Sequence, residues 1–135
     1  MHEYSDKVTR IFMLCHFPYE APIALMKKDR GIQLYSGDTF LKMLNDFSLP
    51  IYFLHGHHHY RWVWKSPACP HLTYINAGAP FLSKKRTPPD LGFHEIQIKQ
   101  DAVEFKRHRC IDLQKSNWET YPFEIPNDSN PISLL

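Results

Sequence analysis

The stretch IYFLHGHHH, at residues 51–59, decides how the rest of this sequence is interpreted. Its first four residues are apolar and of types that strands favour, so they predict a short buried strand. Four histidines follow within five positions around Gly56, a residue that would let the backbone turn tightly there. Imidazole is the commonest metal-binding side chain, and loops at strand ends often carry the sites of rigid sheets. The stretch therefore predicts a metal centre at the end of a strand.

The segments on either side of this stretch predict an α/β fold. Residues 8–15 become continuously apolar from Ile11, which is typical of a strand covered on both faces. Residues 39–47 place their apolar side chains on one helical face, and a helix that leads into an apolar strand is typical of an α/β unit. A further strand is expected at residues 72–76, where the chain then reaches a turn of small residues and proline.

The carboxyl-terminal part of the chain has a different pattern. Residues 93–98 and 102–106 alternate between apolar and polar side chains, which predicts an antiparallel hairpin that ends near Cys110. Beyond it the sequence is polar, with scattered aromatic residues and prolines. We therefore divide the chain into a domain at residues 1–110 and a polar tail at residues 111–135, which either docks on the domain or stays mobile.

Composition and charge restrict the class of protein. A chain of 135 residues with 43% hydrophobic and 22% charged residues is typical of one globular domain. The formal net charge of +2 is too small to indicate a nucleic-acid or membrane surface. No apolar run approaches the ~20 residues of a membrane helix, and the polar first residues lack the apolar core of a signal peptide. Three widely spaced cysteines indicate reduced thiols, so we expect a cytoplasmic protein.

Polar side chains follow three of the predicted strands. His16 follows the first, His57 and His59 follow the second, and Asn76 ends the third. In an α/β sheet, the loops at the carboxyl ends of the strands form the ligand site. If the backbone is extended there, His57 and His59 project to the same side and His58 projects away from them. His57 and His59 are then expected to share a metal site, and the side chain of His58 is expected to point toward solvent or substrate.

These elements resemble, in the same order, motifs of the calcineurin-like metallophosphoesterase family. HFP at residues 16–18 is similar to the family's H-x-P element, and GHHH at residues 56–59 is similar to its G-H-x-H element. NAGA at residues 76–79 is similar to the N-x-G-S element that follows one strand later. The resemblance spans roughly residues 8–110. It implies part of an αββα sandwich, with a mixed sheet and a C-terminal antiparallel hairpin.

The same resemblance implies a function and a set of site residues. The implied reaction is the hydrolysis of a phosphomonoester or phosphodiester by a water molecule that two metal ions activate. Nitrogen ligands suit Mn, Fe or Zn, and ligand type alone does not choose among these metals. The implied metal ligands are His16, His57 and His59. The residues expected near the substrate are His58, Tyr60 and Asn76.

The chain also departs from the family pattern. The D-x-H, G-D-x-x-D and G-N-H-[DE] motifs are absent, and only fifteen residues precede His16. GD at residues 37–38 lacks the second aspartate and fits the start of a helix. No bridging carboxylate and no general-acid histidine are therefore identified. We expect the carboxyl-terminal half of an enzyme, which needs a complementing amino-terminal half or assembles as a homo-oligomer through an open sheet edge.

Two other kinds of function remain open. The chain is then either a non-catalytic remnant that acts as a binding or scaffold module, or it holds one structural zinc ion. In the second case Cys69 or His71 completes a site with His57 and His59, because structural zinc has four nitrogen or sulfur ligands. Metal stoichiometry separates these alternatives.

Overall fold

Two β-sheets and a helix form the part of the chain that the computed structural model describes, which is residues 8–20, 37–57, 61–78, 91–127 and 132–133. A proline at residue 22 predicts a short helix over residues 22–28, a segment that lies outside these ranges. The elements are, in order, β1 (Ile11–Cys15), α2 (Gly37–Asn45), β2 (Ile51–His55), β3 (Arg61–Lys65), β4 (Leu72–Ala77), β5 (Gly92–Ile98), β6 (Val103–Asp112), β7 (Asn117–Phe123) and β8 (Ile132–Ser133).

The larger sheet has five strands in the order β1-β2-β4-β3-β8. β1, β2 and β4 run parallel to one another, whereas β3 is antiparallel to both β4 and β8. In the parallel part, Cys15 lies opposite His55, which lies opposite Asn76. The carboxyl ends of these three strands therefore lie side by side at the same end of the sheet, as the sequence predicts.

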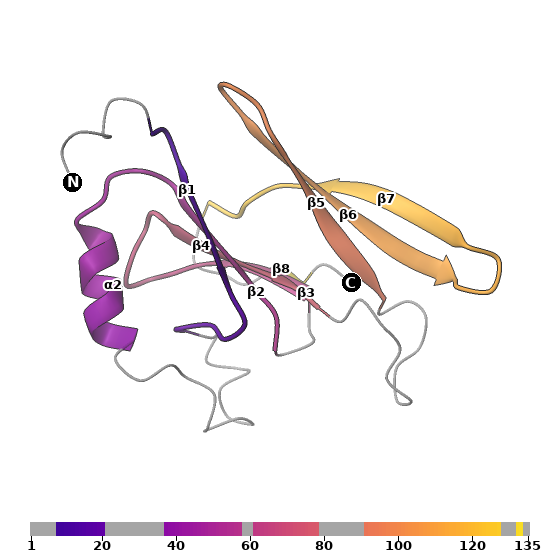
Figure 1. Cartoon of the computed structure of the whole chain (residues 1–135), viewed down its shortest axis with the longest axis horizontal. Helices are drawn as coiled ribbons and strands as arrows, with labels where there is room; N and C mark the ends of the chain where they lie inside the picture. Colours follow the sequence, from indigo (N-terminus) through magenta and orange to yellow (C-terminus); the bar gives the residue numbers. More distant parts are fainter. Residues whose placement is uncertain (1–7, 21–36, 58–60, 79–90, 128–131, 134–135) are drawn as a thin grey trace.

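One face of the five-stranded sheet packs against α2 (Figure 1). Along β2, Ile51, Phe53 and His55 are buried on this face, and Leu41 and Leu44 of α2 are buried in the same core. The predicted apolar face of the helix is thus confirmed, because Phe40 and Phe47 also pack against this core. The other buried members of the core are Trp62, Trp64, Cys69, Leu72 and Tyr74.

The opposite face packs against the three-stranded antiparallel sheet β5-β6-β7 (Figure 1). Val63 and Ile75 meet Phe105 of β6 in a second, smaller apolar core. The described residues thus form three layers, a helix, a mixed sheet and an antiparallel sheet, in an α/β arrangement composed mostly of strands. The expected hairpin is present as β5 and β6. A second helical layer, as in an αββα sandwich, is not seen among the described residues.

Part of the expected tail belongs to the three-stranded sheet. Residues 117–123 form β7, which pairs with β6 from Phe105 to Asp112, with a bulge between Cys110 and Asp112. β6 itself continues past the expected end of the hairpin at Cys110. The sequence of β7 looks like a polar tail because six of its seven residues are exposed, as an edge strand permits. Residues 117–123 thus lie within this sheet, and the division of the chain at residue 110 stays a prediction.

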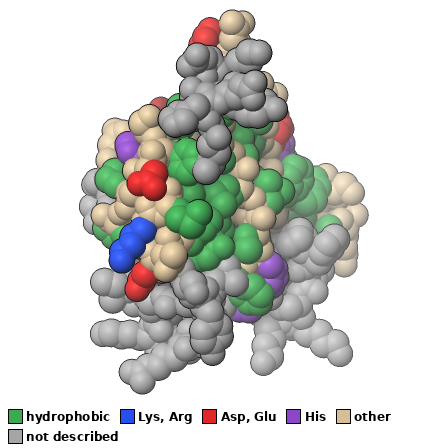
Figure 2. Space-filling view, turned by 60° about the vertical axis from the view of Figure 1, so that its left-hand side comes forward, with side chains coloured by type: hydrophobic (Ala, Val, Ile, Leu, Met, Phe, Trp, Pro, Cys, Tyr) green, Lys and Arg blue, Asp and Glu red, His purple; other side chains and the backbone are tan. Residues whose placement is uncertain are grey.

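β1 differs from its prediction as a strand covered on both faces. It is the outermost strand of its sheet, and among the described residues it pairs only with β2. Its Leu14 side chain is 80% exposed. An apolar run does not reveal whether another layer of the fold covers each face of a strand, which explains the difference. Hydrophobic side chains reach the surface in the view of Figure 2.

The described residues bear on two further expectations. Cys15, Cys69 and Cys110 are free thiols, as expected for reduced cysteines. No helix among the described residues is long and apolar enough to cross a membrane.

Candidate metal centre

The parallel pairing of β1 with β2 positions the candidate site. Because Cys15 lies opposite His55, the residues that follow them leave the sheet side by side. The backbone N–H of Gly56 donates a hydrogen bond to the carbonyl oxygen of His16 at 3.3 Å. This contact continues the ladder by one step and places His57 beside His16.

The imidazole rings of His16 and His57 meet in this position. The Nδ1 atom of His57 lies 3.2 Å from the Nε2 atom of His16, so one ring can donate a hydrogen bond to the other. Two imidazole nitrogens on one tetrahedral metal ion, each at about 2.0–2.1 Å, would be roughly 3.3 Å apart. The observed separation matches this geometry. The distance between these two nitrogens is therefore one that two ligands of a single metal ion can have.

Phe17 holds both imidazoles, a role that the sequence pattern did not indicate. Its ring centroid lies 4.6 Å from that of His57 and 4.8 Å from that of His16. The contact with His16 is edge-to-face, an arrangement that aromatic pairs favour. The sequence feature that could have indicated this contact is the aromatic residue between His16 and Pro18. In the structure its ring packs against both imidazoles.

The backbone at the histidine cluster differs from the expected extended form. His57 has a φ of 64°, in the left-handed region that few residues other than glycine adopt. At Gly56, an added Cβ would meet its nearest neighbour, Nδ1 of His16, at an ordinary distance of 3.8 Å. The tight turn thus occurs at His57, so the backbone is not extended at this residue. Residues 58–60, with the expected roles of His58, His59 and Tyr60, lie outside the described residues.

Asn76 lies at the same end of the sheet as this histidine pair, and its side chain is below the surface. Its side chain is fully buried, and its Oδ1 accepts a hydrogen bond from the backbone N–H of Gly78 at 3.0 Å. Gly78 has a φ of 79°, which favours glycine. Asn76 therefore closes the turn after β4.

His55 is separate from the pair. Its ring is 5% exposed and packs against Phe53, Trp62 and Tyr74 on the α2 side of the sheet. Its Nδ1 also contacts the carbonyl oxygen of Gly56 at 3.1 Å. His55 therefore has a packing role.

Acidic side chains are the missing part of the candidate centre. The described residues contain no group of three or more His, Cys, Asp or Glu side chains that could hold a metal ion. Glu20, four residues after His16, contacts the hydroxyl of Ser66 instead. Burial raises the pKa of this carboxyl group, and its hydrogen bond to Ser66 opposes that rise. The two histidines alone therefore offer neutral ligands without a carboxylate.

The structural-zinc alternative conflicts with the fold. Cys69 and His71 precede β4, and the N–H of Ile51 donates to the carbonyl oxygen of His71 at 2.8 Å. They lie at the start of β2, whereas His57 follows its end. Four residue steps of about 3.3 Å separate the two ends of this strand, a total of about 13 Å. A metal ion bound to His57 is therefore too far away for Cys69 or His71 to complete its coordination.

Comparison of the chain with models of known protein families, with curated proteins and with solved structures found no match in any of the three.

Proposed function

We propose that this chain is the carboxyl-terminal part of a metal-dependent phosphoesterase similar to the calcineurin-like metallophosphoesterases. It hydrolyses a phosphomonoester or phosphodiester when other residues complete its metal centre. The observation that carries the proposal is the 3.2 Å separation of the His16 and His57 ring nitrogens at the carboxyl ends of two parallel strands. That position is the usual ligand site of an α/β sheet.

Each residue has a distinct role in this proposal. His16, His57 and His59 bind Mn, Fe or Zn, and Phe17 keeps the first two rings in place. When bound, the metal ions activate water and stabilise charge on the phosphoryl oxygens. His58 and Tyr60 contact the substrate. Asn76 was expected to do the same, and from its buried position it acts by shaping the loop that borders the site.

The proposal includes a partner because the centre needs negative charge. Three neutral imidazoles do not neutralise two divalent cations. A strand that pairs in parallel with the open edge of β1 would end beside His16, where a carboxylate is required. The partner is a complementing amino-terminal half or a second copy of this chain. In this proposal the partner also completes the αββα sandwich.

The proposed location is the cytoplasm. The three free thiols support it, because cysteines stay reduced in that compartment.

Metal binding by the full chain tests the proposed ligands. We expect His16→Ala and His57→Ala each to weaken Zn²⁺ or Mn²⁺ binding by roughly tenfold or more, since even an outer-shell partner of a ligand is worth about 10–100-fold. His71→Ala is the matched control, because His71 is exposed and lies at the other end of the sheet. Equal metal affinity in all four proteins would contradict the proposal.

The catalytic part needs the protein as its native source makes it. Intact mass would show whether Met1 is the true start of the chain, and co-purified chains would identify the partner. We expect this material to hydrolyse an aryl phosphate with Mn²⁺, and the His57→Ala form to lose that activity. Metal binding without hydrolysis in the native assembly would favour the non-catalytic binding module.

A further inference from the structure

A polar cavity lies at the end of the five-stranded sheet opposite the candidate metal centre. Its volume is about 330 Å³, within the range of small-molecule sites. Residues from the loops before β2 and β4 border it, and so do residues that follow β7. One of them is His71, whose carbonyl oxygen accepts a hydrogen bond from Ile51 at the start of β2. The length of β2 therefore separates this cavity from His57.

One wall of the cavity is a row of three side chains across the larger sheet. Tyr52 of β2 lies opposite Thr73 of β4, which lies opposite Lys65 of β3. Residues that lie directly opposite one another project to the same face of a sheet. Tyr52 packs against the second apolar core, so this is the face that the three-stranded sheet covers. All three residues line the cavity.

The polar atoms of this row are accessible to a ligand. Within the part of the chain that the structure describes, no hydrogen bond engages the Tyr52 hydroxyl, the Thr73 hydroxyl or the Lys65 ammonium group. None of these atoms is buried without a partner either, so each is open to water. The rest of Thr73 is well enclosed, since this residue is only 3% exposed. A ligand in the cavity can therefore replace water at all three groups.

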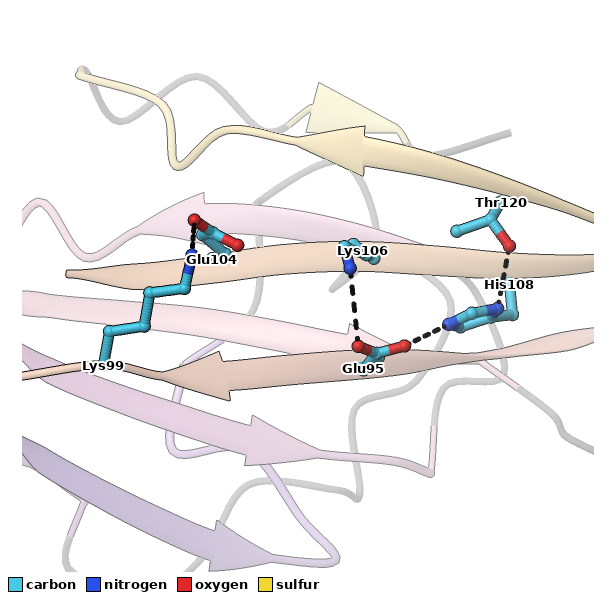
Figure 3. A network of polar contacts seen from close by, with 6 residues as sticks. All are labelled: Glu95, Lys99, Glu104, Lys106, His108 and Thr120. Atoms are coloured by element: carbon cyan, nitrogen blue, oxygen red, sulfur yellow. Dashed lines mark hydrogen bonds and ion pairs between the residues drawn. The ribbon is translucent and has the colours of Figure 1, made fainter.

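The positive charge of Lys65 has no counter-ion among the described residues, whereas other lysines do. Lys106 pairs with Glu95 at 3.6 Å, and Lys99 pairs with Glu104 (Figure 3). Lys65 takes part in none of the ion pairs found in the described ranges. Its charge is thus available to a ligand.

The remaining polar residues of the cavity are also able to donate hydrogen bonds. They are Ser48, His71 and Asn127. The described residues that line the cavity include no Asp or Glu. A cavity with one cation, several donors and no carboxylate favours an anion and disfavours a cation, because hydrogen bonds to a charged acceptor are the stronger ones.

We propose that this cavity binds a small oxyanion, the phosphate or carboxylate group of a ligand. Lys65 is its counter-ion, and the hydroxyls of Tyr52 and Thr73 donate hydrogen bonds to its oxygens. An apolar ligand would take these groups out of water without replacing their hydrogen bonds, which is unfavourable. The inference goes beyond the proposed phosphoesterase function, because the cavity lies at the other end of the sheet and needs no metal ion.

Nuclear magnetic resonance on the full chain tests this proposal directly. The amide and methyl resonances of Thr73 are followed during titration with inorganic phosphate, and separately with acetate, in EDTA and at constant ionic strength set with chloride. We expect at least one anion to shift these resonances to saturation and to leave the amide of Lys106 unchanged. The EDTA separates this result from any failure of the metal proposal.

Three variants show which groups bind the anion. Lys65→Met is expected to weaken binding by about tenfold or more, as the loss of a hydrogen bond to a charged group does. Tyr52→Phe keeps the ring that packs against Phe12 and Phe105, and is expected to weaken binding by roughly fivefold. Lys106→Met is the matched control, because it removes the same charge from a lysine that already pairs with Glu95 (Figure 3). This control is expected to bind like the wild type.

Each outcome has a definite meaning. A response to phosphate alone identifies the ligand group as a phosphate, a response to acetate alone identifies it as a carboxylate, and a response to both supports an oxyanion site that accepts either. The proposal is overturned if neither anion shifts the Thr73 resonances of the wild type, a result that does not depend on the folding of any variant. It is also overturned if Lys106→Met weakens binding as much as Lys65→Met.

Discussion

The Nδ1 atom of His57 lies 3.2 Å from the Nε2 atom of His16, although 41 residues separate the two histidines in the sequence. The pairing of β1 with β2 brings them together, and the Gly56 N–H bond to the carbonyl of His16 fixes their register. Neither histidine alone has the neighbours of a metal site. The candidate centre is therefore a property of the parallel sheet, and anything that separates β1 from β2 should destroy it.

The edge of β1 that pairs with no other described strand predicts association. Leu14 is 80% exposed on this edge strand, and a partner that covers it would gain roughly 2 kcal/mol from burial of its side chain. We expect the chain to associate as its concentration rises, and Leu14→Lys to weaken that association by about 30-fold, which is the same free energy expressed as a ratio. Analytical ultracentrifugation gives the measurement. Met43→Lys is the control, since Met43 is 59% exposed and belongs to α2 rather than to β1. A wild-type monomer at all concentrations, with little binding of a hydrophobic dye, would exclude this use of the edge.

His94 predicts a loss of stability in acid. Its pKa is lowered from 6.5 to about 4 in the folded chain, so the unfolded chain binds a proton more readily between these values. Its contribution to stability is complete above pH 6.5 and is lost as the pH falls toward 4, with a maximum of about 3 kcal/mol. Urea unfolding at pH 7, 5.5 and 4, in buffers without phosphate or carboxylate, measures this loss. We expect His94→Leu to show a shallower dependence on pH than the wild type. Parallel curves for the two proteins would rule out His94 as the cause.

Two glycines are expected to differ in their tolerance of a methyl group. At Gly92, a Cβ would lie 2.1 Å from the carbonyl oxygen of His108, a backbone atom of the neighbouring strand. Gly92→Ala should therefore force β5 from β6 and cost about 2–4 kcal/mol of unfolding free energy, at the upper end of single substitutions. Gly56→Ala should cost less than about 1 kcal/mol, because its nearest contact is at 3.8 Å. Thermal and urea unfolding would show the contrast, and equal losses in the two variants would refute the packing argument.

Arg10 is expected to hold the β5–β6 turn against the start of β1. Its guanidinium donates hydrogen bonds to the carbonyl oxygens of Lys99 at 3.1 Å, Gln100 at 2.7 Å and Ala102 at 2.9 Å. Since the contact is exposed to water, Arg10→Ala should cost only about 1 kcal/mol. The local effect should be larger, with faster hydrogen exchange at the Lys99 amide, which bonds to the Ala102 carbonyl. Lys42→Ala on the exposed face of α2 is the control. Unchanged exchange at Lys99 in Arg10→Ala would show that the turn is stable without it.

Local patterns in the sequence were sufficient for several elements. The apolar run before the histidines forms β2, and the helical spacing of Leu41 and Leu44 produces the buried face of α2. Alternation in period two predicted the β5–β6 hairpin. These predictions succeeded because side chains three or four residues apart share a helix face and those two apart share a strand face. Both rules depend only on neighbours along the chain.

Other features depend on which strands become neighbours. β1 was predicted to be covered on both faces, yet it lies at the edge of its sheet among the described strands, with Leu14 80% exposed. Alternation along β6 groups Arg107 with Phe105 and Lys106 with His108, but both groups contain charged residues. Only the docking of the two sheets decided that Arg107 faces inward, next to His94. Likewise, the histidines at 16 and 57 were recognisable as candidates from the sequence by itself. Their contact, and the left-handed turn at His57, came from the pairing of strands far apart in the chain, which tertiary structure alone determines.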